Sequence, residues 1–210
     1  MPEIMDVSRW QGNIDWKKVK ASGKIDGVML RTVSTNTAYG GIYIDPIFEK
    51  NYWGCVEAGL PVGVYYYTKG ITIDYATKEL AKLKVALEGK TFTLPIAVDV
   101  EDPGLKALSP ESLAQLIKME AKQIEKWGLY AMVYTYTNFA DTALAMHELT
   151  DFDLWIADYR SKRPSRKHGM WQYTNKGKIP GVRGPVDLSH AYKDYPAIIQ
   201  RAGLSRMKEV

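Results

Sequence analysis

Short apolar runs rich in branched and aromatic residues alternate along the chain with stretches of helical periodicity. The apolar runs predict strands over residues 3–8, 27–33, 61–67, 94–100 and 129–135. Apolar residues spaced three or four positions apart predict helices over residues 15–22, 45–58, 74–88, 109–127 and 139–146. Strands that alternate with helices in this way form a parallel sheet.

Local signals mark where several of these helices begin and end. Asp45–Pro46 and Ser109–Pro110 each place a capping side chain before a proline, which predicts an N-cap followed by the first helical residue. A glycine after the last apolar position predicts the end of most of the helices. The polar stretch 35–44, which contains two adjacent glycines, is expected to be a loop.

After the last of these helices the alternation stops. Apolar runs predict three more strands at residues 153–159, 169–173 and 185–188 with no helix between them, and a closing helix over residues 195–202. This α/β pattern predicts a TIM-like (β/α)5(β)3 barrel, formed by residues 1–210 as a single domain. The alternative is an open doubly wound sheet, which usually has a glycine-rich phosphate loop after an early strand. Residues 6–10 are not such a loop.

Composition excludes several classes of protein. The chain has 210 residues, 46% of them hydrophobic, and its net charge of +4 is too small to predict a nucleic-acid partner. The single cysteine, Cys55, excludes an internal disulfide framework. No apolar run approaches the ~20 residues of a membrane span, and no signal peptide is visible. We therefore expect no membrane insertion, and either release by an assisted route or trimming from a longer chain.

Acidic residues gather where the fourth predicted strand ends. In Leu94–Asp102 an apolar run leads directly into three carboxylates. Alternation along a strand puts Asp99 and Glu101 on one face, with Cα atoms roughly 6–7 Å apart, and Val98 and Val100 on the other. Buried acids are costly unless they have a function. A carboxylate pair with separated pKa values is what acid-assisted hydrolysis needs, above all that of glycosidic bonds.

Other strand ends carry further polar and aromatic residues. In a barrel of this kind the active site lies at the C-terminal ends of the strands. The first strand ends in Asp6 and the eighth at Asp187, so three strands deliver acids to one rim. The remaining candidates at this rim are Tyr65, Tyr67, Tyr134, Tyr136, Asp158 and Gln172. The sequence therefore predicts an acid-based site with aromatic walls, which often bind sugars.

Other chemistries fit the sequence less well. The histidines, His147, His168 and His190, are scattered without the spacing of zinc ligands, so we expect neither a metal nor a cofactor. The chain has no G-x-S-x-G elbow and no P-loop. The basic segment 160–167 is interpreted as a solvated loop, with contact to an anionic polymer as the alternative. It lacks interleaved aromatic residues, which argues against single-stranded nucleic acid.

Six short sequence motifs follow one another along the chain. Asp6–Gly12 reads D-x-S-x-x-Q-G, Ala58–Tyr67 reads A-G-L-P-V-G-x-Y-x-Y, and Asp99–Glu101 reads D-x-E. Further along come L-W-I-A at 154–157, W-Q-Y at 171–173 and G-P-V-D at 184–187. Together they resemble the glycoside hydrolase family 25 lysozymes, the Chalaropsis-type muramidases found as phage endolysin catalytic domains and bacterial wall hydrolases. The resemblance covers nearly the whole chain.

This resemblance implies an activity and roles for particular residues. The implied reaction is cleavage of the β-1,4 bond between N-acetylmuramic acid and N-acetylglucosamine in peptidoglycan. By position, Glu101 would be the general acid, and Asp99 would stabilise positive charge or orient the N-acetyl group of the substrate. Asp6 and Asp187 would complete the acidic pocket. Tyr134 is implied as a substrate contact, and Tyr65, Tyr67 and Gln172 are predicted as further ones.

Two positions depart from the family pattern, and several alternatives stay open. Tyr66 stands where many members have His, and Ser189 stands where D-x-N would place Asn after Asp187. The strand spacing allows retention or inversion at the anomeric carbon, whereas the resemblance implies retention. A glycan-binding barrel without turnover and a metal-dependent polysaccharide deacetylase are the alternative functions. We expect a monomer that acts outside the cell on the wall and binds peptidoglycan strands.

Overall fold

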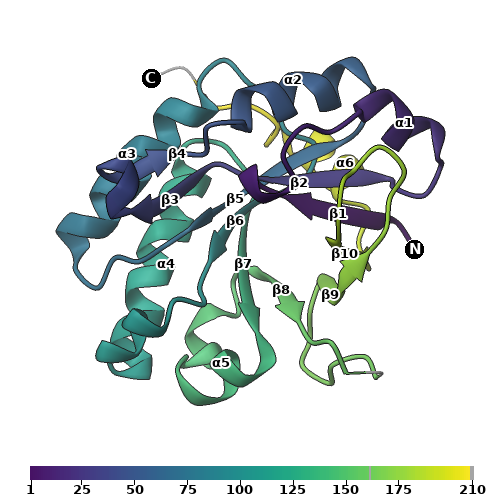
Figure 1. The fold of residues 1–210 in the computed structure, drawn as a ribbon. Coiled ribbons are helices and arrows are strands. Elements are labelled where there is room, and N and C mark those ends of the chain that lie inside the picture. The colour runs from purple at the N-terminus through teal and green to yellow at the C-terminus, as the bar shows by residue number, and fades with distance from the viewer. Residues whose placement is uncertain (161, 209–210) are drawn as a thin grey trace.

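The chain folds around a closed barrel of eight strands (Figure 1). The computed structural model describes residues 1–160 and 162–208. Around the barrel the strands follow the order β1-β10-β9-β8-β7-β6-β5-β2. Their bounds are β1 Glu3–Val7, β2 Gly27–Arg31, β5 Val62–Tyr67, β6 Ile96–Asp99, β7 Ala131–Tyr136, β8 Asp153–Ala157, β9 Met170–Gly177 and β10 Val186–Ala191. The predicted TIM-like barrel is confirmed.

Helices cover the first part of the barrel and are absent between its last strands. The α-helices are α1 Trp16–Ala21, α2 Phe48–Glu57, α3 Ile73–Leu87, α4 Pro110–Lys126, α5 Thr137–Thr142 and α6 Tyr195–Ala202. Short 3-10 helices are η1 Arg9–Gln11, η2 Thr37–Tyr39, η3 Pro103–Ala107 and η4 Met146–Leu149. Figure 1 shows β8, β9 and β10 following one another without a helix, as the sequence predicts. Over the described residues, no helix combines the length and apolar character needed to span a membrane.

Alternation along the strands separates an inner core from an outer one. On β6, Val98 packs in the outer cluster between strands and helices, whereas Ala97 belongs to the inner cluster. Asp99 therefore points into the barrel. The interior is closely filled: a Cβ on Gly63 would lie 2.5 Å from the Pro95 carbonyl oxygen. Side chains of α6 complete the inner cluster, and the acids lie beyond its apolar residues at the strand ends.

The direction of the last strand differs from the prediction. β10 runs antiparallel to β1, with Asp187 opposite Asp6, and antiparallel to β9 as well. A short connection without a helix joins antiparallel strands, whereas parallel strands need a longer crossover. Asp187 therefore reaches the rim from the beginning of its strand. Gln172, predicted at a strand end, is the third residue of β9, which continues to Gly177 in a hairpin with β10.

The segment predicted as a loop forms a hairpin instead. β3 (Val33–Asn36) pairs with β4 (Gly41–Ile44), and η2 connects them. Val33 and Tyr43 are buried, while much of the remaining hairpin stays accessible and polar. A strand with one polar, solvent-facing side lacks a continuous apolar run, so the search for such runs did not predict β3 and β4. The predicted strand 27–33 is accordingly divided between β2 and β3.

Asp45, predicted as the cap of α2, binds the turn before this helix and two other segments of the chain. α2 begins at Phe48, and its neighbour Ile47 provides no side-chain cap. Asp45 Oδ1 accepts the Ile47 N–H at 3.1 Å, one residue before the helix. Asp45 Oδ2 accepts hydrogen bonds from the Arg9 backbone N–H at 3.0 Å and from Arg31 Nη2 at 2.8 Å. In α4, by contrast, Ser109 is the N-cap as predicted.

The helix expected over residues 139–146 is divided. α5 covers Thr137–Thr142, and the separate turn η4 begins at Met146. Between them the Ala145 N–H donates to the carbonyl of Pro110 at the start of α4. This bond to a distant residue takes the donor that a continuous helix would use internally.

Two buried glutamates connect β5 to α3 and α4. Tyr66 points outward and donates to Glu120 Oε2 at 2.9 Å. Thr68 Oγ1 lies 2.9 Å from Glu79 Oε2 and 3.1 Å from Glu120 Oε1. A hydroxyl has one proton, so Thr68 donates to one carboxyl and accepts from the other. Glu79 also accepts two backbone N–H groups, so we infer that Glu120 is the protonated partner. Burial, followed by repulsion from Glu79, raises the pKa of Glu120 to about 8.

This pair predicts a stability that falls as the pH rises. An unfolded Glu has a pKa of about 4.3, so between that pH and about 8 the folded state binds more protons than the unfolded state. The free energy of unfolding then decreases through this interval. Glu120→Gln keeps the shape without the charge and should remove this part of the pH dependence, which is on the order of a few kcal/mol.

Thermal unfolding midpoints between about pH 5 and pH 9 test this expectation. Glu111→Gln, on the exposed side of the same helix, is the matched control and should follow the wild type. Equal pH dependence in the wild type and Glu120→Gln would show that Glu120 is already ionised in the folded protein.

Candidate active site

Four acidic side chains meet at the open end of the barrel. Asp6 of β1, Asp99 at the end of β6, Glu101 just beyond it and Asp187 of β10 line one cavity of ≈ 180 Å³. We call this cavity the acid pocket. Its other lining residues are Tyr65, Tyr134, Trp155, Tyr159 and Gln172. The structure thus brings together the acids that the strand ends suggested.

A glutamine bridges the floor of the acid pocket to one of the acids. Gln172 Nε2 donates to Asp6 Oδ2 at 2.9 Å. Gln172 Oε1 accepts from the hydroxyls of Tyr134 at 3.0 Å and Tyr159 at 2.7 Å. Two hydroxyl donors on one side favour the amide orientation that directs its N–H toward Asp6. The bridge therefore fixes Asp6 relative to the two tyrosines.

Asp99 has an unused acceptor in the pocket. The residue is only 3% exposed, and within residues 1–160 and 162–208 its buried Oδ1 has no hydrogen-bond partner. A buried polar atom without a partner costs ~1–3 kcal/mol. Asp99 is thus held ready to accept a hydrogen bond from a molecule that enters the pocket.

Burial raises the pKa values of all four acids, and repulsion between carboxylates adds to it for Asp6, Asp99 and Glu101. Burial is the largest cause for each. Repulsion from Asp187 further raises the pKa of Asp6 and of Glu101, and repulsion from Glu101 and Asp6 further raises the pKa of Asp99. Like charges at such short range do not all ionise together. The pocket therefore retains a proton that it can donate.

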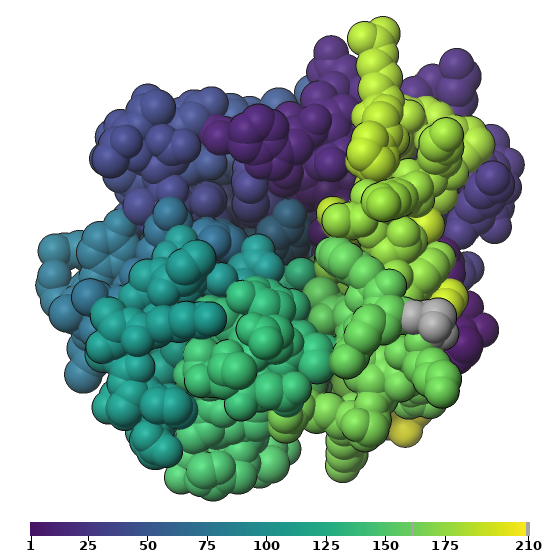
Figure 2. All heavy atoms as spheres, turned by 60° about the horizontal axis from the view of Figure 1, so that its bottom comes forward, coloured from purple at the N-terminus to yellow at the C-terminus, as the bar shows by residue number. Residues whose placement is uncertain are grey.

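Glu101 lies where the acid pocket opens into a larger groove. This groove, of ≈ 520 Å³, follows β7 and β8, and its lining residues include Glu101, Tyr134 and Tyr159, which also line the acid pocket. Asp6 and Asp99 are buried, whereas Glu101 keeps partial access to solvent. In Figure 2 a hollow lies between the purple N-terminal residues and the green segments after β7 and β8. Of the four acids, Glu101 is the one that faces both spaces.

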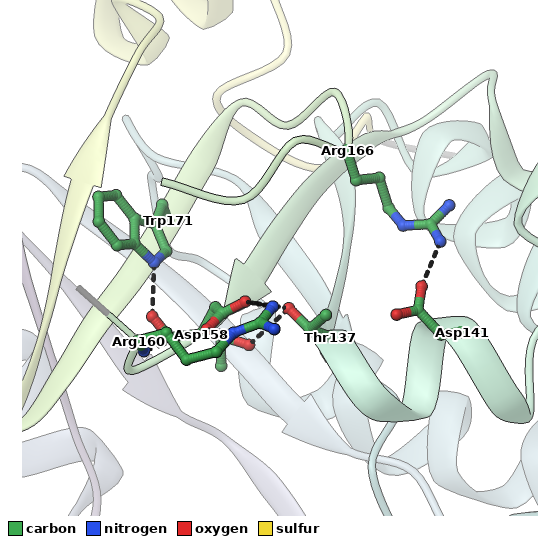
Figure 3. A network of polar contacts seen from close by, with 7 residues as sticks. Thr137, Asp141, Asp158, Arg160, Arg166 and Trp171 are labelled. Carbon is green, nitrogen blue, oxygen red and sulfur yellow. Dashed lines mark hydrogen bonds and ion pairs between the residues drawn. The ribbon is translucent and has the colours of Figure 1, made fainter. Parts of the chain in front are cut away.

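Ion pairs hold the outer wall of the groove (Figure 3). Asp158, just after β8, accepts hydrogen bonds from Arg160 Nε at 2.8 Å and from Thr137 Oγ1 at 2.7 Å. Arg166 Nη2 donates to Asp141 of α5 at 2.6 Å. The Arg160 hydrogen bonds lower the pKa of Asp158 to about 2. Asp158, singled out as a rim acid, is therefore an ion-pair partner outside the acid pocket.

The described residues of the basic segment 160–167 form an exposed loop, as interpreted from the sequence, and its arginines make several contacts. Besides the two pairs of Figure 3, the Arg163 guanidinium lies 3.7 Å from the ring centre of Tyr192. Arg163 Nε also lies 3.1 Å from His168 Nε2. Three arginines of this segment therefore have partners within the protein: Arg160, Arg163 and Arg166.

Two residues singled out in the β5 segment lie outside the acid pocket. Tyr67 donates its hydroxyl to Asp102 Oδ2 at 3.2 Å, and Lys69 Nζ lies 3.1 Å from the same oxygen. Tyr67 therefore borders the pocket and does not line it. Tyr66, where many family members have His, faces the outer helices and Glu120. Strand alternation alone predicts this outward direction for Tyr66.

Two lining residues, Trp155 and Tyr159, were not predicted as site residues. Trp155 donates its indole N–H to Ser189 Oγ at 3.0 Å, and its ring meets those of Tyr134 and Tyr65 with centroids 4.6 Å and 6.2 Å apart. Ser189, at the expected Asn position, thus supports the aromatic floor. Alternation along β8 could have predicted that Trp155 points into the barrel, because its neighbours Leu154 and Ile156 point outward. Tyr159 lies beyond the end of β8, where strand alternation no longer predicts the direction of a side chain.

Known proteins share this sequence pattern and fold. The sequence model of glycosyl hydrolases family 25 matches residues 5–182. The uncharacterized protein YegX of Escherichia coli strain K12 is 30% identical over 193 residues, covering 88% of this chain and 67% of that protein. The autolytic lysozyme of Clostridium acetobutylicum is 28% identical over 186 residues, covering 88% of this chain and 54% of that protein. The bacterial lysozyme structure from Streptomyces coelicolor matches with a TM-score of 0.80 at 21% identity, covering 96% of each chain.

The coupling among the acids predicts a measurable change in one of them. Asp6→Asn removes a charge that raises the pKa of Asp99 and keeps an oxygen that accepts the Gln172 N–H. The pKa of Asp99 should therefore fall, as followed by carboxyl carbon NMR. Asp74→Asn, at an exposed position of α3, should leave the Asp99 titration unchanged. An Asp99 pKa that is the same in Asp6→Asn and the wild type would contradict the coupling.

Proposed function

The chain belongs to glycosyl hydrolases family 25 and is a peptidoglycan-hydrolysing muramidase, and we propose that Glu101 is its general acid. The observation that carries this assignment is the place of Glu101 between the acid pocket and the groove. A polysaccharide in the groove has one sugar in the pocket and the next beside Tyr134 and Tyr159, with Glu101 at the bond between them. The bond cleaved is the β-1,4 bond between N-acetylmuramic acid and N-acetylglucosamine.

Glu101 can supply a proton because its surroundings raise its pKa. Burial, Asp187 and Asp102 all disfavour the charged form. In the proposed reaction Glu101 protonates the glycosidic oxygen as the bond to the anomeric carbon breaks, and it becomes a carboxylate. That carboxylate then accepts a proton from the water that completes hydrolysis.

Asp99 is the proposed helper of the reacting sugar. Its free Oδ1 accepts the N–H of the substrate acetamido group, which directs the acetamido carbonyl oxygen toward the anomeric carbon. Attack by this oxygen followed by attack by water inverts the carbon twice. The proposal therefore includes overall retention of the anomeric configuration.

The other acids and aromatic residues surround the same sugar. Asp6, fixed through Gln172, and Asp187 supply negative potential where positive charge develops in the transition state. Tyr65, Tyr134 and Trp155 form an aromatic floor on which a sugar ring packs. We propose that residues 1–210 act as one catalytic domain and as a monomer, outside the cytoplasm, on wall peptidoglycan.

Product analysis tests the proposed bond and stereochemistry. Mass spectrometry of digested peptidoglycan should show fragments with muramic acid at the reducing end, and NMR during the reaction should show the β anomer first. Reducing-end glucosamine would place the cut at the other glycosidic bond. Deacetylated strands without cleavage would instead indicate a deacetylase, and an initial α anomer would exclude retention.

Substitution of the proposed acid should abolish most of the activity. Glu101→Gln cannot donate the proton, so the rate of wall clearing should fall by about 10²–10⁴-fold while the circular dichroism spectrum stays unchanged. The matched control is Glu57→Gln, an exposed glutamate at the end of α2, which should clear walls at the wild-type rate. A Glu101→Gln protein that is nearly as active as the wild type would refute the assignment.

A further inference from the structure

Three aromatic rings surround one arginine at the rim of β1. The Arg9 guanidinium carbon lies 4.7 Å from the ring centre of Trp10, 4.6 Å from that of Tyr39 and 5.5 Å from that of Tyr43. Tyr39 and Tyr43 are stacked, with centroids 4.5 Å apart. Arg9 and Trp10 belong to η1, and the tyrosines belong to the β3–β4 hairpin. We call these four residues the Arg9 platform.

The platform presents aromatic surface to solvent on a fixed backbone. Trp10 is 73% exposed and Tyr39 is 48% exposed. A capping box holds the start of the turn that carries Trp10: Ser8 Oγ accepts the Trp10 N–H at 3.3 Å, and Gln11 Oε1 accepts the Ser8 N–H at 2.9 Å. Large exposed apolar side chains that are held in place mark binding surfaces. An indole face is suited to stacking against the apolar face of a sugar.

Arg9 brings a positive charge that no described carboxylate neutralises. Among residues 1–160 and 162–208 it forms no ion pair, and its Nη1, which is buried against the rings, has no hydrogen-bond partner. The nearby Asp45 is bound to Arg31 through its side chain and to Arg9 only through the backbone N–H. The aromatic rings hold the guanidinium by cation–π contact. This arrangement favours an anionic ligand, and a carboxylate matches the planar guanidinium.

The barrel places the platform across the acid pocket from the groove. In the ring of strands β1 stands opposite β7. The groove follows β7 and β8, the acid pocket has walls from both β1 and β7, and Arg9 follows directly after β1. A linear polymer that enters by the groove and passes Glu101 therefore continues toward the platform.

We propose that the Arg9 platform is a distal subsite for the glycan strand. Trp10 and Tyr39 stack on a sugar ring beyond the acid pocket, and Arg9 binds a carboxylate carried by that sugar. This inference rests on the proposed function, because a peptidoglycan strand offers such carboxylates in its stem peptides, and in its lactyl groups where the stem peptide has been removed. The platform then favours long strands over short fragments without taking part in bond cleavage.

The length of the glycan substrate tests whether Trp10 stacks on a distal sugar. Trp10→Ala should lower kcat/KM on long glycan strands by about tenfold, which corresponds to about 1.4 kcal/mol, mainly through KM. On short oligosaccharides that span only the pocket and the groove, it should match the wild type. Trp53→Ala, which removes a half-exposed tryptophan from α2, is the control and should change neither substrate. Equal kcat/KM of Trp10→Ala and the wild type on long strands would overturn the subsite.

Carboxylate chemistry tests the charged part. Arg9→Gln should raise KM on intact long strands but match the wild type on strands whose carboxylates are converted to methylamides. Arg201→Gln, an exposed arginine of α6, should match the wild type on both. Enzymatic removal of the stem peptides frees the lactyl carboxylates. A loss that disappears on such strands assigns a peptide carboxylate, and a loss that persists shows that Arg9 also binds a freed lactyl carboxylate.

Two results separate this inference from the proposed function. An equal loss for Arg9→Gln on native and amidated strands would show that Arg9 does not read a carboxylate, and the charged part would be overturned. A wild-type protein that cleaves neither long nor short strands would contradict the proposed function instead. Circular dichroism of each variant confirms that the fold is retained in these comparisons.

Discussion

The burial of like charges at the mouth of the barrel is the constraint on which the rest of the structure depends. Asp6 and Asp99 are almost inaccessible, and Glu101 and Asp187 lie beside them in the same cavity. Ionised carboxylates in such a place repel one another and lose hydration, so they favour the protonated form. A fold that gathers these groups must balance the cost through the apolar packing of the barrel beneath them.

Hydrogen bonds and aromatic contacts shape this charged pocket. Gln172 fixes Asp6 against two tyrosine hydroxyls, and Ser189 fixes the indole of Trp155. Arg31 opposes the rise in the pKa of Asp99 while it also binds Asp45. The Asp45 carboxylate also accepts a hydrogen bond from the Arg9 backbone N–H. One network of polar contacts therefore joins the acid pocket to the turn after β1.

A second network of acids lies on the other side of the same strand. Tyr65 faces the acid pocket, and Tyr66 contacts Glu120 among the outer helices. Thr68 then joins Glu120 to Glu79 just beyond the end of β5. Neighbouring residues of one strand thus contact two acidic clusters with different tasks. The inner acids are accessible to a ligand, whereas the outer pair is enclosed and holds the start of the β5–α3 connection.

The sequence by itself determined where the eight barrel strands lie and which way the side chains of β6 point, although it predicted the β3–β4 hairpin as a loop. Alternation over 96–101 placed Asp99 and Glu101 on one face, and Ser109 before Pro110 determined a helix start, because these features depend on neighbouring residues. Tertiary structure decided the direction of β10, the hydrogen bond from Thr137 to Asp158, the partners of Asp45 and the inclusion of Tyr159 in the pocket. Strand direction depends on how the barrel closes, and the role of a carboxylate depends on the charges brought beside it. A local pattern contains neither kind of information until distant segments meet.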